Sequence, residues 1–365
     1  MHAPLGLSGD SYEEARWQLV LDKLSKSTQA TFNIQFKWWQ LFCKIRGEDL
    51  VLKTALPSKS TSAQDRIDAE NLVLDYIIHS GLVLHKAPGT VTIRLAAIRS
   101  YHLNLGLQDP FLLMPRVPMA MAGLKRRAGK QERRHPVTTR MLRWVKKHLL
   151  IFENEEAAVI WAALCIGFFF LLRASEYLDV GRNVPNRGLN NCHVVLKRLG
   201  EPCDRTNFEQ ADEVAICIQG SKTDIFNRGQ NRNHFINLDE DPESRLCVVE
   251  AIVNLCKFRP DRLFQQVYKD DPLLLGCNRR QITRNTIQSI LRTTAQGTGS
   301  DSKDYGSHSL RFGGASALWA AYHDSGLVRR WGRWATDSFH TYIWEDRKGA
   351  EGISSAMAKS DVAPT

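Results

Sequence analysis

The stretch from residue 306 to residue 345, GSHSLRFGGASALWAAYHDSGLVRRWGRWATDSFHTYIWE, holds four polar or aromatic residues whose spacing predicts a shared site. His308 and Arg311 are three residues apart, which places both side chains on one face of a helix. Trp334 follows His308 by twenty-six residues, and Tyr342 follows Trp334 by eight. Each of the four taken alone is more often an ordinary core residue, so the interpretation depends on what the upstream chain supplies.

A tyrosine near cations and hydrogen-bond donors suits the transfer of a phosphoryl group to its phenol. The phenol attacks, and fixed donors stabilise the charge that grows on the phosphate oxygens. Upstream, Arg173 follows a long apolar segment, where a cation is costly unless it meets an anion. Lys222 lies in SKTD at residues 221–224, between two alternating segments, so a hairpin tip is expected there. The alternatives are a helix-capping ion pair between Arg173 and Glu176 and a lysine that is merely solvated.

Six residues occur in the order and setting of the signature of the tyrosine recombinases, the phage-integrase superfamily, which this sequence resembles: Arg173, Lys222, His308, Arg311, Trp334 and Tyr342. The Gly-Arg-Trp box at 332–334, with a Phe and a Tyr soon after, most resembles recombinases of Crypton and DIRS-type mobile elements. The resemblance covers about residues 20–345 and is weaker before residue 156. It implies a site-specific DNA recombinase, active in DNA recombination and integration, that cuts and rejoins strands through a covalent 3′-phosphotyrosine intermediate. It implies no metal and no other cofactor.

The resemblance also implies a role for each residue. Tyr342 would be the nucleophile, and Arg173 and Arg311 would hold the non-bridging phosphate oxygens. Glu176 would orient the guanidinium of Arg173 from behind.

The remaining residues would transfer protons or donate single hydrogen bonds. His308 and Trp334 would each donate one hydrogen bond, and His308 could also accept the proton of the attacking phenol. Lys222 would protonate the leaving 5′ oxygen.

Two of these assignments have competitors in the same stretch. Trp331 competes with Trp334, although Trp334 has the spacing from His308 that the family shows. Tyr305 and Tyr322 compete with Tyr342, but they lie at the two ends of the expected helix at 309–322 rather than beyond it.

The composition favours a two-domain protein that binds a polyanion. The chain has 365 residues, more than a usual single domain. Its formal net charge of +10 and pI near 9.2 favour nucleic acid first and an anionic membrane second. Eight cysteines without a Cys-x-x-Cys pair favour a reducing compartment over a disulfide scaffold. The most apolar run, residues 157–172, is too short to span a bilayer and is expected to be a buried core helix.

The expected fold class is two domains. One is an all-α N-terminal core-binding domain of the SAM-like helical type, and the other is an α+β tyrosine-recombinase catalytic domain with a small antiparallel sheet. The expected boundaries are residues 10–127 for the helical DNA-binding domain, 128–136 for a basic linker, 137–348 for the catalytic domain and 349–365 for a C-terminal tail. That tail is either an arm that docks on a neighbouring protomer or a disordered end.

Hydrophobic periodicity places the secondary structure. Apolar residues at intervals of three and four predict early helices capped near Ser27 and at 60–62, and a third that starts at Pro88. Alternation predicts three strands at 193–196, 214–218 and 234–238, with part of 181–212 as a loop insertion. Further helices are expected at 139–150, capped near Thr138, and at 156–172, 245–259, 260–268, 283–295, 309–322 and 325–333, and a last helix carries Tyr342.

Basic residues concentrate in and around the expected linker. Ten Lys or Arg residues and one acid lie between residues 125 and 147. A linker this basic is expected to lie along DNA phosphates. The alternative is a solvated linker that contacts no DNA. The segment KRRAGK at 125–130 could also serve as a nuclear-import signal. The predicted DNA-binding residues are Lys37, Arg94, Arg99, Lys125, Arg126, Arg127, Lys130, Arg133 and Arg134.

The expected partner is double-stranded DNA, bound by a homotetramer on two DNA sites, with no membrane association. The expected location is intracellular, at DNA: the nucleus in a eukaryote, or the cytoplasm or nucleoid in a bacterium or phage. Two rival functions share parts of the pattern. One is a type IB topoisomerase, which relaxes DNA as a monomer, and the other is a non-catalytic, domesticated DNA-binding protein.

Overall fold

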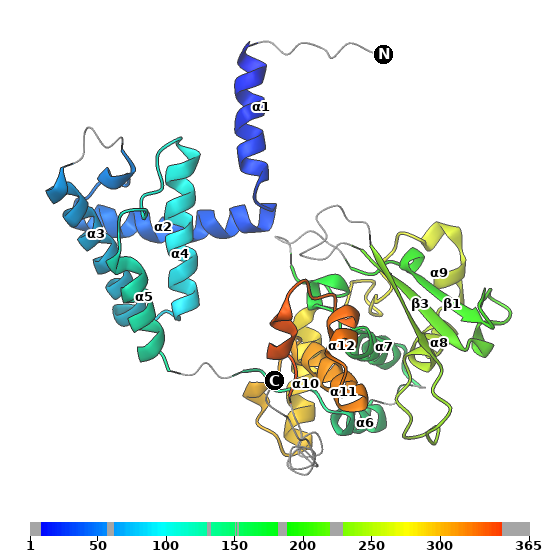
Figure 1. The fold of residues 1–365 in the computed structure, drawn as a ribbon. Coiled ribbons are helices and arrows are strands. Elements are labelled where there is room, and N and C mark those ends of the chain that lie inside the picture. The colour runs from blue at the N-terminus through cyan, green and yellow to red at the C-terminus, as the bar shows by residue number, and fades with distance from the viewer. Residues whose placement is uncertain are drawn as a thin grey trace, which may run out of the picture. The chain divides into compact units, whose positions relative to one another are not determined.

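The computed structural model describes residues 9–56, 62–129, 133–149, 151, 153–181, 188–219 and 229–344 (Figure 1). The chain divides into two compact units, Met1–Gln131 and Glu132–Thr365, here named unit 1 and unit 2. Each unit has a hydrophobic core of its own. All residues with an expected catalytic role fall within unit 2.

The described part of unit 1 is helical. Its elements are α1 (Gly9–Asp22), α2 (Lys26–Arg46), the 3₁₀ turn η1 (Lys53–Ala55), α3 (Ala63–Ile78), the π turn η3 (His79–Val83), α4 (Pro88–Asn104) and α5 (Arg116–Arg127). α2 packs against α4, and α3 packs against α5. Ser62 caps α3 in a capping box with Asp65, as predicted. Ser25 caps α2, so this helix begins earlier than the predicted cap at Ser27, and α1 was not predicted.

Aromatic side chains of α2 and α3 form the centre of unit 1. The ring of Trp39 is fully buried and meets that of Tyr76 edge-on at 5.1 Å. Phe42 lies at the same distance from Tyr76. These contacts explain the apolar stripe of α2, because residues three and four apart share one helix face.

The described part of unit 2 contains seven α-helices. They are α6 (Thr139–His148), α7 (Glu155–Phe169), α8 (Val248–Phe258), α9 (Pro260–Phe264), α10 (Arg284–Gly297), α11 (Ser309–Tyr322) and α12 (Ser325–Trp331). α7 is buried from Ala157 to Phe168 and packs against α8 and α11. Asn154 caps it by accepting hydrogen bonds from two backbone N–H groups. The prediction of a buried core helix is therefore confirmed, although α7 ends at Phe169 rather than at the predicted Leu172. Among the described residues no helix is both long and apolar enough to cross a membrane.

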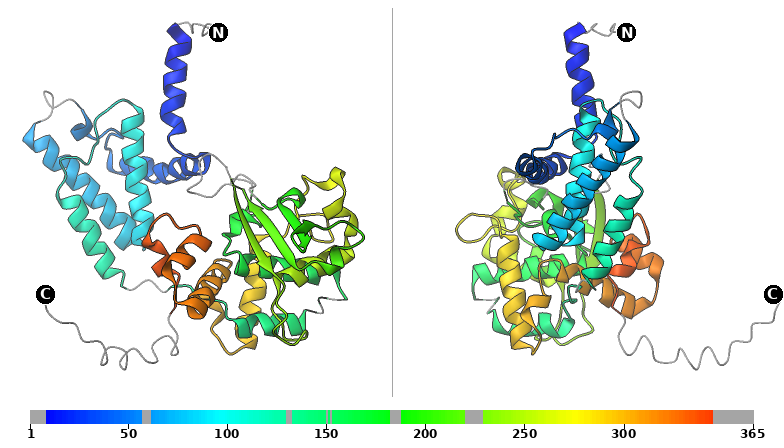
Figure 2. Two further views of the ribbon diagram at one scale, coloured as in Figure 1. Left: turned by 45° about the vertical axis from the view of Figure 1, so that its right-hand side comes forward. Right: turned by 90° about the vertical axis from the view of Figure 1, so that its left-hand side faces the viewer.

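A four-stranded antiparallel sheet, drawn in shades of green in Figure 2, completes unit 2. Its order is β2-β1-β3-β4, with β1 (Val194–Arg198), β2 (Glu201–Pro202), β3 (Glu213–Ile218) and β4 (Gln230–Phe235). The β1–β2 turn uses two left-handed residues, Leu199 (φ 52°) and Gly200 (φ 87°), which suit a tight hairpin. This hairpin lies inside the segment expected to include a loop insertion.

The third predicted strand was misplaced. β4 begins at Gln230, four residues before the predicted start at 234, and ends at Phe235. It is an edge strand, and its partner β3 pairs Ile216 with Arg232 and Val214 with His234. The segment 230–233 is polar, so backbone pairing rather than apolar alternation sets this strand.

The chain just before α6 belongs to unit 2. The backbone N–H of His135 donates to the oxygen of Asp304 at 2.9 Å, and that of Val137 to Ser309 at 3.0 Å. The expected linker at 128–136 is therefore fixed to unit 2 from residue 133 onward. Near the C-terminus, the predicted last helix is the 3₁₀ turn η9 (Asp337–Thr341), which ends at Tyr342.

Candidate active site

α11 positions the first pair of site residues. His308 precedes the first turn of α11, and Arg311 follows within that turn and is completely buried. Two glycines allow α11 to approach its neighbours closely. A β-carbon on Gly313 would lie 2.1 Å from the backbone oxygen of Val137, and one on Gly314 would lie 2.1 Å from that of Phe168. The His-x-x-Arg helix is thereby held against α7.

The end of α7 brings Arg173 to the same place. Leu171 adopts a left-handed backbone (φ 51°) that turns the chain after the helix. Its carbonyl oxygen accepts a hydrogen bond from Nη1 of Arg311. Two residues later Arg173 donates from Nη1 to Oε1 of Glu176 at 3.0 Å, and its backbone N–H donates to Oε2 at 2.8 Å. Glu176 is buried, whereas the side chain of Arg173 is 22% exposed and can meet a ligand.

The Gly-Arg-Trp box supplies three different contacts. The oxygen of Gly332 accepts from Nη2 of Arg311 at 2.6 Å. A β-carbon at this glycine would lie 1.6 Å from the ring of Trp334, so only glycine leaves room for the indole. Arg333 donates from Nη2 to Oε2 of Glu176 at 2.6 Å.

Tyr342 completes the site. Its hydroxyl lies 3.2 Å from Nε2 of His308, within hydrogen-bond reach. Its ring stacks on Phe312 with centroids 4.7 Å apart, and the ring of Trp334 lies at 4.9 Å. The guanidinium of Arg311 lies 5.6 Å from the same phenol ring. Tyr342, the candidate nucleophile, thus lies next to His308, a candidate base, and near Arg311, a buried cation.

Burial and charge set the protonation of the two α11 residues. Burial, with added repulsion from Arg311 and Arg173, lowers the pKa of His308 to about 4. His308 is therefore neutral at physiological pH and can accept a proton. Burial and the nearby Arg173 lower the pKa of Arg311, but a guanidinium remains charged at neutral pH.

Two buried donors beside Tyr342 have no partner among the described residues. They are Nε of Arg311 and Nε1 of Trp334, whose indole lies 4.4 Å from the Arg311 guanidinium. Buried donors without partners are rare and costly. Among the residues described around this site, three guanidinium groups (Arg173, Arg311 and Arg333) face one carboxylate (Glu176), which leaves two positive charges in excess. The site therefore suits an anion that offers several oxygens, as a phosphodiester does.

The structure brings five of the six expected catalytic residues together: Arg173, His308, Arg311, Trp334 and Tyr342. Lys222 lies outside the described residues. The competitor Trp331 uses its N–H to bind the oxygen of Phe169 at 3.2 Å. Tyr305 is buried with its ring near His135, and Tyr322 is 67% exposed near the end of α11.

The predicted DNA-binding residues have different surroundings. Lys37 on α2 is exposed, as are Lys125, Arg126 and Arg127 on α5, and Arg99 is paired with Asp109 at 2.6 Å. Lys130 lies outside the described residues. Arg133 and Arg134 donate to backbone oxygens of Thr341 and Lys303, so both are engaged within unit 2.

Arg94 corrects the DNA-binding prediction. Its side chain is 1% exposed and donates to the hydroxyl of Ser80 at 2.9 Å and to the side-chain oxygen of Gln35 at 3.3 Å. The guanidinium also lies 4.8 Å from the ring of Trp38. Arg94 is a structural residue of unit 1 and is not available to DNA.

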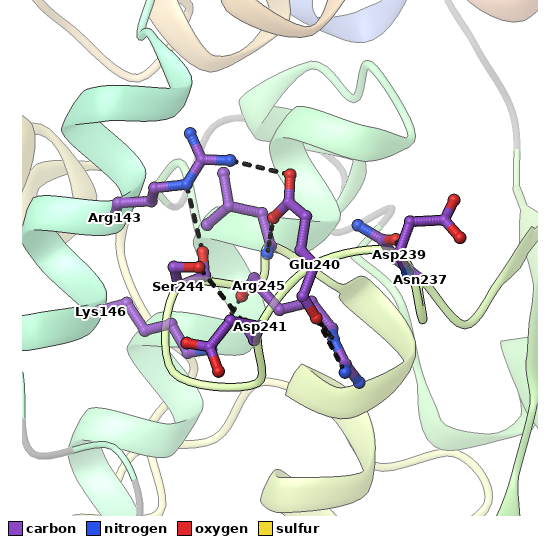
Figure 3. A network of polar contacts seen from close by, with 9 residues as sticks. Arg143, Lys146, Asn237, Asp239, Glu240, Asp241, Ser244 and Arg245 are labelled. Atoms are coloured by element: carbon purple, nitrogen blue, oxygen red, sulfur yellow. Dashed lines mark hydrogen bonds and ion pairs between the residues drawn. The ribbon is translucent and has the colours of Figure 1, made fainter.

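Part of the basic run on α6 is also engaged internally, as Figure 3 shows. Arg143 pairs with Glu240 at 2.9 Å and donates to the backbone oxygen of Ser244. Lys146 donates to the backbone oxygens of Pro242 and Arg245, each at 2.8 Å. These contacts fix the loop between β4 and α8, so the run is less of a DNA-binding surface than its charge suggests.

Sequence reasoning treated Gly332 and Arg333 only as parts of a box. The structure gives both a contact within the site, to Arg311 and Glu176 respectively. The sequence did contain one signal for a role of Arg333 in the site, because this arginine lies directly between Gly332 and the candidate catalytic residue Trp334.

Comparisons with known proteins place the fold. Protein-family models give no match to this sequence, and curated proteins give none either. Among solved structures, XerH site-specific recombinase bound to a palindromic difH substrate has a TM-score of 0.51 and 16% identity, with 83% of this chain and 74% of that chain covered. The Tn1549 transposon integrase in complex with circular intermediate DNA has a TM-score of 0.46 and 10% identity, with 88% of this chain and 99% of that chain covered. A lambda integrase dimer bound to a core site has a TM-score of 0.45 and 10% identity, with 93% of this chain and 98% of that chain covered.

The similarity to XerH shows that this chain has the fold of that recombinase structure, a helix-rich chain with a small antiparallel sheet. The two other structures have TM-scores below 0.5, so the fold similarity rests on XerH. At 16% identity it establishes the fold alone.

Proposed function

We propose that this protein is a site-specific DNA recombinase that cuts and rejoins strands through a 3′-phosphotyrosyl intermediate. The observation that carries the proposal is the 3.2 Å contact between the Tyr342 hydroxyl and Nε2 of His308. This contact joins a nucleophile to a base that burial keeps neutral. It lies beside Arg311, a buried cation whose Nε has no partner within the described ranges of the chain.

The proposed cleavage step is a direct displacement at phosphorus. The Tyr342 oxygen attacks, its proton passes to Nε2 of His308, and the bond from phosphorus to the 5′ oxygen breaks. Arg173 and Arg311 contact the non-bridging oxygens, and the indole N–H of Trp334 adds one donor. We propose Lys222 as the acid that protonates the departing 5′ oxygen.

Rejoining reverses the same chemistry. A 5′-hydroxyl from another strand attacks the phosphotyrosine, and the bond between Tyr342 and phosphorus breaks. The bond energy of the phosphodiester is kept in the covalent intermediate, which is why neither a cofactor nor ATP enters the proposal.

We further propose an affinity with the recombinases of Crypton and DIRS-type mobile elements. Support comes from the box at 332–334 and the eight-residue interval to Tyr342. In this proposal unit 1 is the helical DNA-binding domain and unit 2 is the catalytic domain. Four protomers would assemble on two sites of double-stranded DNA, in the nucleus of a eukaryotic host or the cytoplasm of a bacterial one.

The direct test is covalent trapping on a pool of randomised duplexes with a nick at a fixed position. Cleavage close to the nick releases a short fragment, so the 5′-hydroxyl is lost and the adduct persists. We expect the wild-type protein to form a denaturation-resistant adduct, and sequencing the attached DNA gives the cognate duplex. Tyr342→Phe should form none, whereas Tyr322→Phe, at an exposed tyrosine near the end of α11, should behave as wild type.

Two results would redirect the proposal. An adduct that persists in Tyr342→Phe would assign the nucleophile elsewhere. Relaxation of a supercoiled plasmid that lacks the recovered sequence would favour the type IB topoisomerase, which needs no cognate site.

A further inference from the structure

The carboxylate of Glu176 is shared between two arginines that lie far apart in the sequence. Oε1 accepts from Nη1 of Arg173 at 3.0 Å, while Oε2 accepts from the backbone N–H of Arg173 at 2.8 Å and from Nη2 of Arg333 at 2.6 Å. The side chains of Glu176 and Arg333 are 3% and 2% exposed. A buried carboxylate with both oxygens engaged in this way has a fixed orientation.

Two features make the position of Arg333 energetically unfavourable. Its backbone is left-handed (φ 59°), a conformation that residues with a β-carbon adopt rarely. Its Nε and Nη1 are buried and have no partner among the described residues. An arginine placed here only for packing would be replaced with advantage by an apolar side chain. The contact that distinguishes it from such a side chain is the ion pair with Glu176.

We propose that Arg333 is a positioning residue that acts through Glu176 to aim the guanidinium of Arg173 at the scissile phosphate. This inference rests on the proposed function, because it assigns Arg173 a phosphate to hold. Without Arg333, the carboxylate of Glu176 would face Arg173 alone and would neutralise it as a closed ion pair. With Arg333 on Oε2, the carboxylate charge is divided, and Arg173 keeps charge for a phosphate oxygen.

The same contact fixes geometry as well as charge. Arg173 follows the irregular end of α7 and has a side chain that is partly exposed, so its guanidinium needs a rigid neighbour. Arg333 sits between Gly332, whose oxygen binds Arg311, and Trp334, whose ring lies beside Tyr342. One short segment therefore connects both phosphate-holding arginines to the nucleophile.

The test compares two forms of the cognate duplex, one with an ordinary scissile phosphodiester and one with a methylphosphonate at that position. The methylphosphonate lacks the negative charge that Arg173 would hold, so residues acting through Arg173 should matter less on it. Strand cleavage is measured, because it reports the same step on both substrates. The main variant is Arg333→Asn, since asparagine tolerates a left-handed backbone.

We expect Arg333→Asn to slow cleavage of the phosphodiester on the order of 100-fold and that of the methylphosphonate only slightly. Arg333→Lys, which keeps a cation for Glu176, should restore most of the rate. In an Arg173→Ala background, Arg333→Asn should cause no further loss. Glu176→Gln tests the pair from the other side with an isosteric change, and Arg333→Asn should add nothing to it.

Two results would overturn the positioning role and leave Arg333 a structural residue. One is that Arg333→Asn lowers the cleavage rate equally on both substrates. The other is that its loss of rate adds to the loss caused by Arg173→Ala. The same conclusion would follow if Glu176→Gln cleaved as fast as wild type, even where Arg333→Asn failed to fold. Failure of the wild-type protein to cleave any duplex would instead reject the proposed function itself.

Discussion

At the scale of single residues, the proposed function depends on the charge state of His308, because only a neutral ring can accept the proton of Tyr342. The imidazole is partly buried beside two arginines, and these surroundings favour its neutral form. An ordinary histidine would be partly protonated just below neutral pH, and its protonated fraction could not accept the proton of a phenol. His234, a second histidine of unit 2, has its pKa lowered to about 4 by burial, but its Nε2 lies 2.9 Å from the backbone oxygen of Phe169 and it has no part in the proposed chemistry.

We predict that the ring of His308 titrates near pH 4 in the free protein, which NMR of its ring protons can follow. The unfolded chain binds this proton near pH 6.5, whereas the folded protein does not bind it until about pH 4. The free energy of unfolding should therefore fall as the pH is lowered from about 6.5 towards 4. His308→Gln should lose less stability over this range, and His234 serves as an internal control because it is present in both proteins. A midpoint near 6.5 would contradict the prediction.

At the scale of elements, the turn after α12 is organised by a glycine. Gly332 leaves space for the indole of Trp334 and gives its carbonyl oxygen to Arg311. The indole then packs with Leu171, Val328 and Phe339 in a small cluster beside Tyr342. α12, the turn after it and Tyr342 are therefore coupled by packing as well as by sequence proximity.

We predict that Gly332→Ala displaces the indole and lowers the free energy of unfolding of unit 2 by about 1–3 kcal/mol, the usual effect of overpacking. Urea unfolding gives the stability, and near-ultraviolet circular dichroism reports the environment of the indole. Gly306→Ala is the matched control, because a β-carbon there would make only ordinary contacts, at 3.7 Å or more. Similar stability for the two variants would show that the turn adapts.

Helices with complete local signals could be predicted from the sequence, whereas elements set by tertiary contacts could not. α11 was predicted as observed, from Ser309 to Tyr322, and the Thr138 cap of α6 is confirmed. β4 was misplaced because an edge strand needs only one partner and carries little apolar alternation.

The same distinction applies to the candidate site. The order and spacing of its residues indicated a shared site, and the structure brings five of them together. The pairing of Arg333 with Glu176 spans 157 residues of sequence and has no local signal. The burial of Arg94 could not be foreseen either, because its partners Ser80 and Gln35 come from other segments of unit 1.

At the scale of the whole molecule, the segment before α6 is an integral part of unit 2. The ring of His135 lies 4.9 Å from that of Trp344, and Arg133 binds the backbone oxygen of Thr341. These residues contact the chain on both sides of Tyr342. The sequence-based start of the catalytic domain at residue 137 would remove them.

We predict that a fragment of residues 132–365 is more stable than a fragment of residues 137–365. The shorter fragment loses the backbone bond from His135 to Asp304 and the contacts around Trp344, so its free energy of unfolding should be lower by about 1–3 kcal/mol. Urea unfolding of both fragments measures the difference, and each acts as the other's control because both lack unit 1. Equal stability would show that the segment adds nothing to unit 2.

The three-residue box at 332–334 has a practical consequence for surveys of genomes. Under the proposed function, a gene copy that keeps the tyrosine codon but changes the codon for Gly332 or Arg333 would still encode the nucleophile, yet without the contacts that surround it. Sorting intact genes from decayed ones by the tyrosine alone would therefore overcount the intact ones. The box read together with the codon for Glu176 gives a stricter criterion, since each member has its own contact in the site.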